Sequence, residues 1–505
     1  KRNIWEKLSE YFFQNQREQS DALSNEMLEK LKEIIGMFQP QDIQDQYRHL
    51  FTEYDYSFYE KPDGDWDEEQ KKLRVKREKA ILDIYQKEGA KGIIHFSEIV
   101  PSVMQLATIL GEMESITIES DFFPSLLNDG NTNHKQLVDI YIRSRPHIKG
   151  WGWVDQIDKN NWTDEEKTQF LLALPFVKET WELVSSWLSE NEELYWKAVR
   201  SNGYRKDCDY SIAIDKLIKY GRPFQAIYCL SNMLYGHNQH LTADLCIHVL
   251  KLAAESNEPS QEINTDTIRD IILFLQKDDF LNEEDLLAIE LRYIALFDKY
   301  RYQKEFFPKT IERKMASDPK FFCELIQYVY YSEKDKERLN AKEREKENIY
   351  SIFHLLNNWR IIPGVQSDNT FDSEKFNLWF DKVKEICTIS GHWKNASYHI
   401  GQVLTYSPID PDGLWIHKTL VTALNERTAK NIRSGYSTSI YNSRGVHTID
   451  PTGKPERELA EKYRVQAKEL EENGFINFAT ELKKMANRYE NEAERIIEEY
   501  SKGDE

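Results

Sequence analysis

Residues 389–398, ISGHWKNASY, contain the pattern that decides the fold. A helical pattern of apolar residues ends at Gly391, and four residues separate that glycine from Ala396 in the next helical pattern. Glycine adopts the left-handed conformation that closes a helix, and a small alanine lets the following helix approach its partner closely. The segment therefore predicts two helices joined by a tight corner.

The same pattern occurs twice more, at Gly221 with Ala226 and at Gly474 with Ala479. Recurring helical hairpins of this kind are typical of tetratricopeptide-like arrays. Because the copies are irregularly spaced, we predict a degenerate array: an all-α fold, an α-solenoid of stacked helical hairpins of tetratricopeptide-like or HEAT-like character. The alternative is that these segments are ordinary helix–turn–helix corners without a repeat.

The composition supports helices throughout. Of 505 residues, only 20 are glycine and 15 are proline, which is too few for the many turns of an all-β fold. Hydrophobic residues make up 40% of the chain, enough for a large core. At Thr163 and Glu166 the sequence has the spacing of a capping box, which predicts a helix start.

Four regions are expected along the chain. Residues 1–125 form an N-terminal helical region, 126–332 a central helical-repeat body, 333–348 a charged linker or exposed helix, and 349–505 a C-terminal helical-repeat region. Within the last region, residues 435–455 are rich in Gly, Ser and Thr and are expected to form a long loop. Since residue 1 is lysine, we expect the chain to be a piece of something longer.

The net charge of −19 disfavours nucleic acid, because acidic residues repel a phosphate backbone, and it disfavours anionic membrane surfaces for the same reason. No stretch approaches the roughly 20 apolar residues of a membrane span. The five cysteines are scattered and never form a CxxC pair, as is typical of reduced thiols. The sequence therefore predicts a cytoplasmic protein without membrane contact.

Motifs that carry chemistry are missing from the sequence, which contains no Walker loop, GxGxxG turn, HExxH pair or GxSxG elbow. His237 and His240 are closely spaced, but a structural zinc site needs a second close pair of ligands. Pairs of acidic residues are expected by chance among 86 carboxylates. We therefore predict no catalytic residue, no metal and no cofactor.

Two places are candidates for binding a partner. Asn442, Arg444 and His447 lie beside a glycine in the expected loop, and Arg444 has the geometry to grip a carboxylate or phosphate. The alternative is that Arg444 pairs with an acidic residue of the chain itself. Trp151 and Trp153 offer rings for stacking, but without interleaved basic residues a hydrophobic contact between helices is favoured.

Several short segments of the C-terminal third carry a family resemblance: residues 359–364, 399–401, 410–417, 442–447 and 462–464. Together they resemble the C-terminal regions of large bacterial antiviral STAND NTPases. In that family an effector and an ATPase precede a helical-repeat sensor. Because the ATPase motifs are missing here, the resemblance implies that this chain is the sensor portion. It further implies recognition of a phage protein through a concave helical surface.

The expected function is a non-catalytic helical-repeat scaffold or sensor that binds a protein partner, since solenoids offer large curved surfaces. Homo-oligomerisation through the parent protein is a further possibility. The alternative is a degenerate enzyme module, such as a nuclease or nucleotide-processing enzyme, with its site near Arg444 and His447. A structural subunit of an oligomer is the third hypothesis.

Overall fold

The computed structural model describes residues 2–17, 23–52, 66–201, 208–237, 240–256, 265–278, 280–300, 303, 305–331, 343–366, 368, 370–445 and 448–501. Contacts divide the chain into two compact units: unit 1 comprises residues 1–242 and 255–261, and unit 2 comprises residues 243–254 and 262–505. The described residues contain helices and no β-strand, only an isolated antiparallel bridge between Val365 and Phe371. The prediction of an all-α protein is confirmed.

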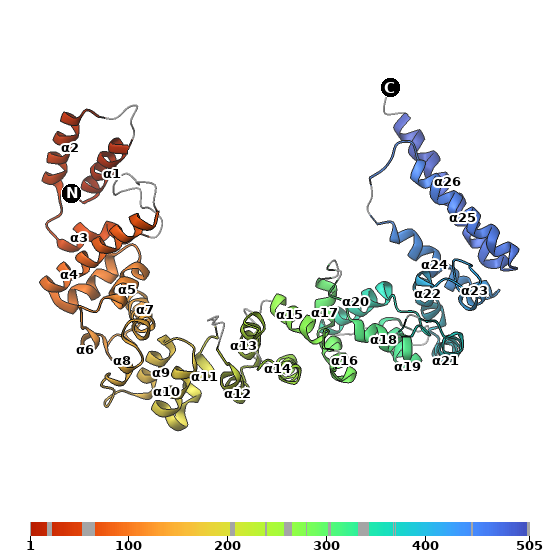
Figure 1. Cartoon of the computed structure of the whole chain (residues 1–505), viewed down its shortest axis with the longest axis horizontal. Coiled ribbons are helices and arrows are strands. Elements are labelled where there is room, and N and C mark those ends of the chain that lie inside the picture. The colour runs from red at the N-terminus through yellow and green to blue at the C-terminus, as the bar shows by residue number, and fades with distance from the viewer. Residues whose placement is uncertain are drawn as a thin grey trace. The chain divides into compact units, whose positions relative to one another are not determined.

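Unit 1 contains helices α1 to α13 (Figure 1). Their bounds are α1 Arg2–Arg17, α2 Asn25–Phe38, α3 Ile43–Tyr47, α4 Trp66–Ile99, α5 Val103–Glu112, α6 Glu119–Phe122, α7 Thr132–Lys149, α8 Gly152–Asp155, α9 Asp164–Ala173, α10 Lys178–Leu188, α11 Glu193–Ala198, α12 Ser211–Lys219 and α13 Pro223–Tyr235. Short 3₁₀ turns follow α3 and α10, at Arg48–Leu50 and Ser189–Asn191.

Unit 2 contains helices α14 to α26, apart from the last residue of α14. Their bounds are α14 Ala243–Glu255, α15 Thr265–Leu275, α16 Glu283–Arg292, α17 Ile294–Lys299, α18 Lys309–Ser317, α19 Pro319–Val329, α20 Glu343–Asn358, α21 Ser373–Ser390, α22 Trp393–Val403, α23 Lys418–Asn425, α24 Lys430–Ser443, α25 Lys454–Glu472 and α26 Ile476–Ser501. A 3₁₀ turn, Leu404–Tyr406, follows α22.

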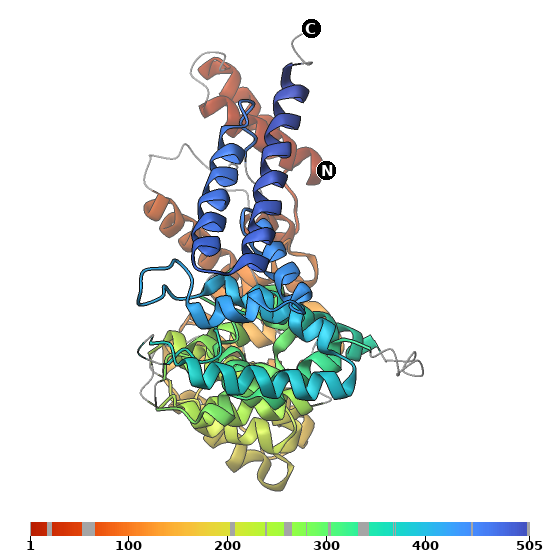
Figure 2. The same cartoon turned by 90° about the vertical axis from the view of Figure 1, so that its right-hand side faces the viewer.

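The three predicted corners have one geometry. Each glycine has a positive φ, of 73°, 78° and 82° in chain order. The N–H after each glycine donates to the carbonyl five residues earlier, and the glycine N–H donates to the carbonyl three residues earlier. This pair of bonds is the Schellman motif, which satisfies the last carbonyls of a helix. It joins α12 to α13, α21 to α22 and α25 to α26, and the last two helices lie side by side in Figures 1 and 2.

Two further local predictions, on the alanines after the corners and on the capping box, are tested by the structure. The alanine after each corner, at 226, 396 and 479, is fully buried, as its proposed role in close helix packing requires. The capping box is also present: the Thr163 hydroxyl accepts from the Glu166 N–H, and the Glu166 carboxylate accepts from the Thr163 N–H. These local signals are confirmed.

The predicted loop at residues 435–455 is wrong over its first nine residues, because α24 runs on to Ser443. A Cβ atom on Gly435 would lie 1.9 Å from the carbonyl oxygen of Tyr398 in α22, and one on Gly401 would lie 1.9 Å from that of Ile432 in α24. The small residues that indicated a loop instead allow two helices to pack backbone against backbone. Composition cannot distinguish these two uses of glycine.

Only part of the charged segment at residues 333–348 lies within the described residues. Residues 332–342 lie outside the described residues, and residues 343–348 form the first turns of α20. The structure divides into two units, whereas the sequence predicted four regions. The predicted boundaries at residue 125 and at residues 333–348 stay predictions.

Hydropathy gives one further finding. In the part of the chain that the structure describes, no helix combines the length and the apolar character that crossing a bilayer requires.

Candidate binding pocket and the predicted site residues

Arg444 stands at the C-terminal end of α24, and its guanidinium contacts the Glu456 carboxylate in the first turn of α25. Glu456 is fully buried, so the pair fixes the start of α25 against the end of α24. The alternative considered for Arg444, pairing with an acid of its own chain, is confirmed. Asn442 is exposed on α24, and His447 lies outside the described residues.

The two tryptophans of the second candidate differ. Trp151 is partly exposed before α8, whereas Trp153 is buried within it. Its indole Nε1 donates to Glu119 Oε1 at 2.8 Å, and its ring stacks on Phe170 at a centroid distance of 6.0 Å. Trp153 is therefore a core residue, and of this pair only Trp151 presents a partly exposed ring.

Trp153 belongs to a buried polar network around Arg145 of α7. The fully buried Arg145 guanidinium donates to the carbonyls of Met113 and Ile116, at 2.7 and 2.9 Å, and lies 3.5 Å from Glu119. Burial alone would raise the pKa of Glu119, but hydrogen bonds from Trp153 and Tyr141 and the charge of Arg145 lower it below its ordinary value. The network anchors the chain between α5 and α6.

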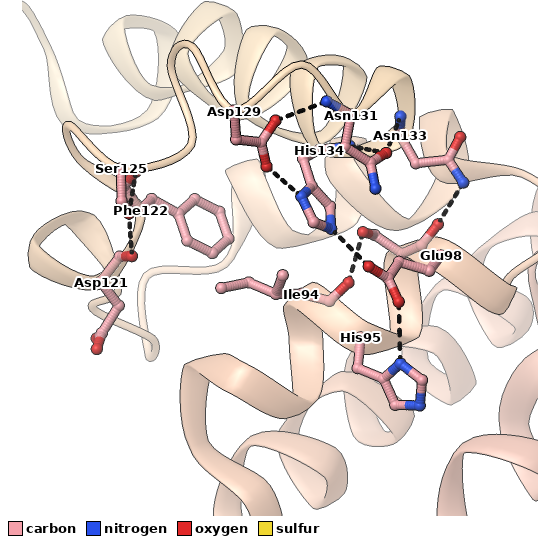
Figure 3. A network of polar contacts seen from close by, with 11 residues as sticks. Ile94, His95, Glu98, Asp121, Phe122, Ser125, Asp129, Asn131, Asn133 and His134 are labelled. Carbon is pink, nitrogen blue, oxygen red and sulfur yellow. Dashed lines mark hydrogen bonds and ion pairs between the residues drawn. The ribbon is translucent and has the colours of Figure 1, made fainter.

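A second polar network in unit 1 surrounds His134, at the start of α7 (Figure 3). Its Nδ1 contacts Asp129, its Nε2 lies 3.2 Å from Glu98, and Glu98 in turn lies 3.2 Å from His95. Asn131 caps α7 by accepting from the His134 N–H. The network thus ties the end of α4 to the start of α7. Across the described residues, no three His, Cys, Asp or Glu side chains converge to hold a metal.

Unit 2 contains a small cavity of about 130 Å³, which opens to the surface. The apolar lining residues are Ile294, Phe297, Phe306, Phe307, Pro308 and Leu355. The polar lining residues are Asp298, Gln303, Glu312, Ser351, His354, Asn358 and Arg360. Side chains of α17, α18 and α20 therefore meet here, although they come from separate parts of the sequence.

The position of α18 in this cavity is set by a buried acid from α16. The residue before α18 is Pro308, which has no side chain that can cap the helix. Glu290 takes that role: its Oε2 accepts from the N–H groups of Thr310 and Ile311, both at 2.9 Å. These N–H groups and the helix dipole favour the charged form of Glu290, but burial outweighs them and raises its pKa to about 7. The first turn of α18 is thereby fixed, and Glu312 lies at its end.

Glu312 is a poorly satisfied acid of the pocket. It is 4% exposed, and its one hydrogen bond among the described residues comes from the Arg360 N–H at 3.4 Å. Burial raises the pKa of Glu312 to about 7, the charge of Glu290 acts in the same direction, and Arg360 offsets only part of this. The pocket therefore contains a carboxyl group that its own surroundings do not stabilise in the charged form.

His354 lines the same side of the pocket. Its Nε2 is buried without a hydrogen-bond partner in the described part of the chain. Its Nδ1 lies 4.0 Å from the Asp298 carboxylate on α17. Asp298 and Glu312 thus place two carboxyl groups on the polar side of the pocket.

An exposed row of aromatic residues adjoins the pocket at His354. We call Tyr330, Tyr350 and Phe353 the aromatic ridge. The ring centroids of Tyr350 and Phe353 lie 4.3 and 5.7 Å from that of His354, and Tyr330 lies 6.4 Å from Phe353. Tyr350 is 54% exposed and Phe353 37%. The Tyr330 hydroxyl is held 2.6 Å from His399 Nε2, so the ridge is anchored to the core.

The sequence interpretation missed the pocket entirely. One signal was present: Glu290 lies four residues after Leu286 and directly after Ile289, on the buried face of its helix. An acid on a buried helical face requires a partner or a function. That pattern identifies a buried carboxylate, but not the side chains that surround it.

Comparisons with known proteins add nothing to this description. No family model matches the chain, and no curated protein or solved structure matches it significantly. The function is therefore argued from the residues and their contacts.

Proposed function

We propose that this chain is a non-catalytic helical-repeat scaffold or sensor that binds a protein partner. In this proposal the helices form an α-solenoid of stacked hairpins, part of a larger cytoplasmic bacterial defence protein that recognises a phage protein. The identical geometry at the corners of α12/α13, α21/α22 and α25/α26 supports the repeat architecture.

The observation that carries the proposal is the aromatic ridge beside the pocket. Tyrosine and phenylalanine side chains are enriched at protein interfaces and dominate their energetics, because they bury a large area with few rotatable bonds. A ridge anchored at Tyr330 and exposed at Tyr350 and Phe353 has the character of such a contact surface. Its position next to a cavity offers both a flat contact area and a recess.

The alternative of a degenerate enzyme site near Arg444 and His447 gains no support from the described contacts. Arg444 is committed to the buried Glu456, where its role is to hold two helices together. A guanidinium in such a pair is not free to stabilise a reacting phosphate.

The experiment is a capture from phage-infected bacteria with the tagged chain, followed by reconstitution with the purified partner. Wild type is compared with the double variant Tyr350→Ser/Phe353→Ser. The matched control is Leu378→Ser/Ile389→Ser, which removes two exposed apolar side chains of α21. We expect one discrete protein to bind wild type and the control, and to bind the ridge variant about tenfold more weakly.

Two results would contradict the proposal. One is equal binding of the partner by all three proteins, which would place the contact elsewhere. The other is the absence of any specific partner for a wild-type chain that is folded by circular dichroism.

A further inference from the structure

We propose that the pocket beside the aromatic ridge receives an arginine side chain of the protein partner, with Glu312 accepting hydrogen bonds from its guanidinium group. This inference rests on the proposed function, and it specifies the chemistry of the partner at one position.

Glu312 is almost wholly buried and has a single long hydrogen bond among the described residues. A buried carboxylate with so few hydrogen bonds costs free energy, so it favours an occupant that donates. Guanidinium has five N–H donors in a planar fork and no acceptor, so it can donate two hydrogen bonds to one carboxylate.

The walls fit the rest of the side chain. Phe297 and Phe306 are stacked with ring centroids 4.4 Å apart, and both line the pocket together with Leu355. Apolar walls suit the methylene stem of an arginine, and aromatic faces attract a guanidinium plane. A lysine shares the charge and the stem but lacks the planar fork, so it is expected to bind more weakly.

The charge around Glu312 also favours a cation. Among the described residues, the groups that face it are Asp298 of α17, Glu290 of α16, His354 of α20 and Arg360 after α20. In that part of the chain, three carboxyl groups, Glu312 included, are set against one permanent positive charge. Arg360 is exposed at the rim, and as a pure donor it suits the backbone carbonyls of an entering segment. The chain's net charge of −19 attracts basic partners at longer range.

Binding is expected to depend on pH. Because burial raises the pKa of Glu312 to about 7, its carboxyl group is largely protonated in acid and must lose that proton to pair with guanidinium. Affinity for an arginine side chain should therefore rise between about pH 6 and about pH 8.

The test uses two small probes on the whole chain, observed by saturation-transfer NMR. N-acetyl-arginine methylamide carries the charge, and N-acetyl-citrulline methylamide has nearly the same shape without it. The variants are Glu312→Gln, which is isosteric, and Glu374→Gln, which removes an exposed acid of α21 as a matched control. We expect the arginine probe to bind wild type and Glu374→Gln, with affinity falling about tenfold for citrulline or for Glu312→Gln.

Equal binding of both probes, or unchanged arginine binding by a Glu312→Gln chain that is folded by circular dichroism, would overturn the inference. So would an affinity for the arginine probe that is flat across the same pH range.

The partner capture separates this inference from the proposed function. A partner that binds wild type and Glu312→Gln equally would leave the scaffold proposal standing and overturn the arginine contact. Failure of wild type to bind any partner would overturn both proposals. A partner that binds Glu312→Gln about tenfold more weakly than Glu374→Gln is the result expected here.

Discussion

Glu119 in unit 1 is partly buried and Glu312 in unit 2 is almost wholly buried, and their surroundings shift the pKa values of the two carboxyl groups in opposite directions. Glu119 accepts from Tyr141 and Trp153 and lies beside the buried Arg145, and its pKa is lowered. Glu312 has one long backbone hydrogen bond, and its pKa is raised to about 7.

The difference teaches how to recognise a binding site in a protein without catalytic motifs. A charge that the fold has fully satisfied is part of the scaffold, and its removal costs stability. A buried charge that has too few hydrogen-bond partners within the fold lowers the stability of the protein. Such a charge indicates a site where a bound molecule supplies the missing hydrogen bonds.

The largest expected effect breaks the satisfied network. Arg145→Met should lower the free energy of unfolding by about 3–5 kcal/mol, because it leaves Glu119 without its cationic neighbour and three carbonyls without their donor. Hydrogen exchange should show faster amide exchange between α5 and α6. The control is Arg313→Met, an exposed side chain, with a change below about 0.5 kcal/mol. Equal stability of the two variants would mean that the network is dispensable.

The second prediction tests whether unit 2 is tightly packed away from its pocket. Gly435→Ala should lower the free energy of unfolding by about 3 kcal/mol, because the new Cβ would meet the Tyr398 carbonyl oxygen at 1.9 Å. Its control has the opposite sign. Gly36 is helical with nothing within 4 Å, so Gly36→Ala should stabilise by about 0.5–1 kcal/mol. Urea denaturation of both variants measures the difference, and a tolerated Gly435→Ala would contradict the close packing of α22 on α24.

The third prediction concerns the unsatisfied acid. The folded-state pKa of Glu312 lies above its unfolded value, so its charge destabilises the fold as pH rises from 4.5 to about 7. Glu312→Gln should therefore stabilise unit 2 by on the order of 3 kcal/mol at about pH 8, and have little effect at about pH 4. Unfolding curves at the two pH values measure this. A variant that is destabilised at pH 8 would show that Glu312 has a partner within the fold.

The smallest expected change in the free energy of unfolding is opposite in sign to that of Glu312→Gln. Glu119→Gln should destabilise unit 1 by about 1–2 kcal/mol at neutral pH, because it weakens charge-assisted bonds from Tyr141 and Trp153. The pKa of Glu119 is lowered on folding, so this contribution is present above the unfolded pKa and disappears as pH falls through the folded value. If Glu119→Gln lowers the free energy of unfolding and Glu312→Gln raises it at neutral to basic pH, the comparison is confirmed. If both variants change it in the same direction, the comparison is wrong.

The sequence by itself determined the helices and several of their ends. Apolar spacing, the left-handed glycines at 221, 391 and 474, and the Thr163 capping box act within one or two turns of chain, so no knowledge of distant neighbours is needed. The same local view failed at Gly435, where a small residue serves a contact with another helix.

Only the tertiary structure decided which polar groups are satisfied. Arg444 finds Glu456, Glu290 caps a helix that begins 19 residues later, and Asp298, Glu312 and His354 meet in one cavity. Hydrogen bonding and desolvation depend on distances across the fold and on exclusion of water, and neither is written in local spacing. Helices and their local ends could therefore be predicted from the sequence, except around Gly435, whereas the pocket formed only when separate helices packed together.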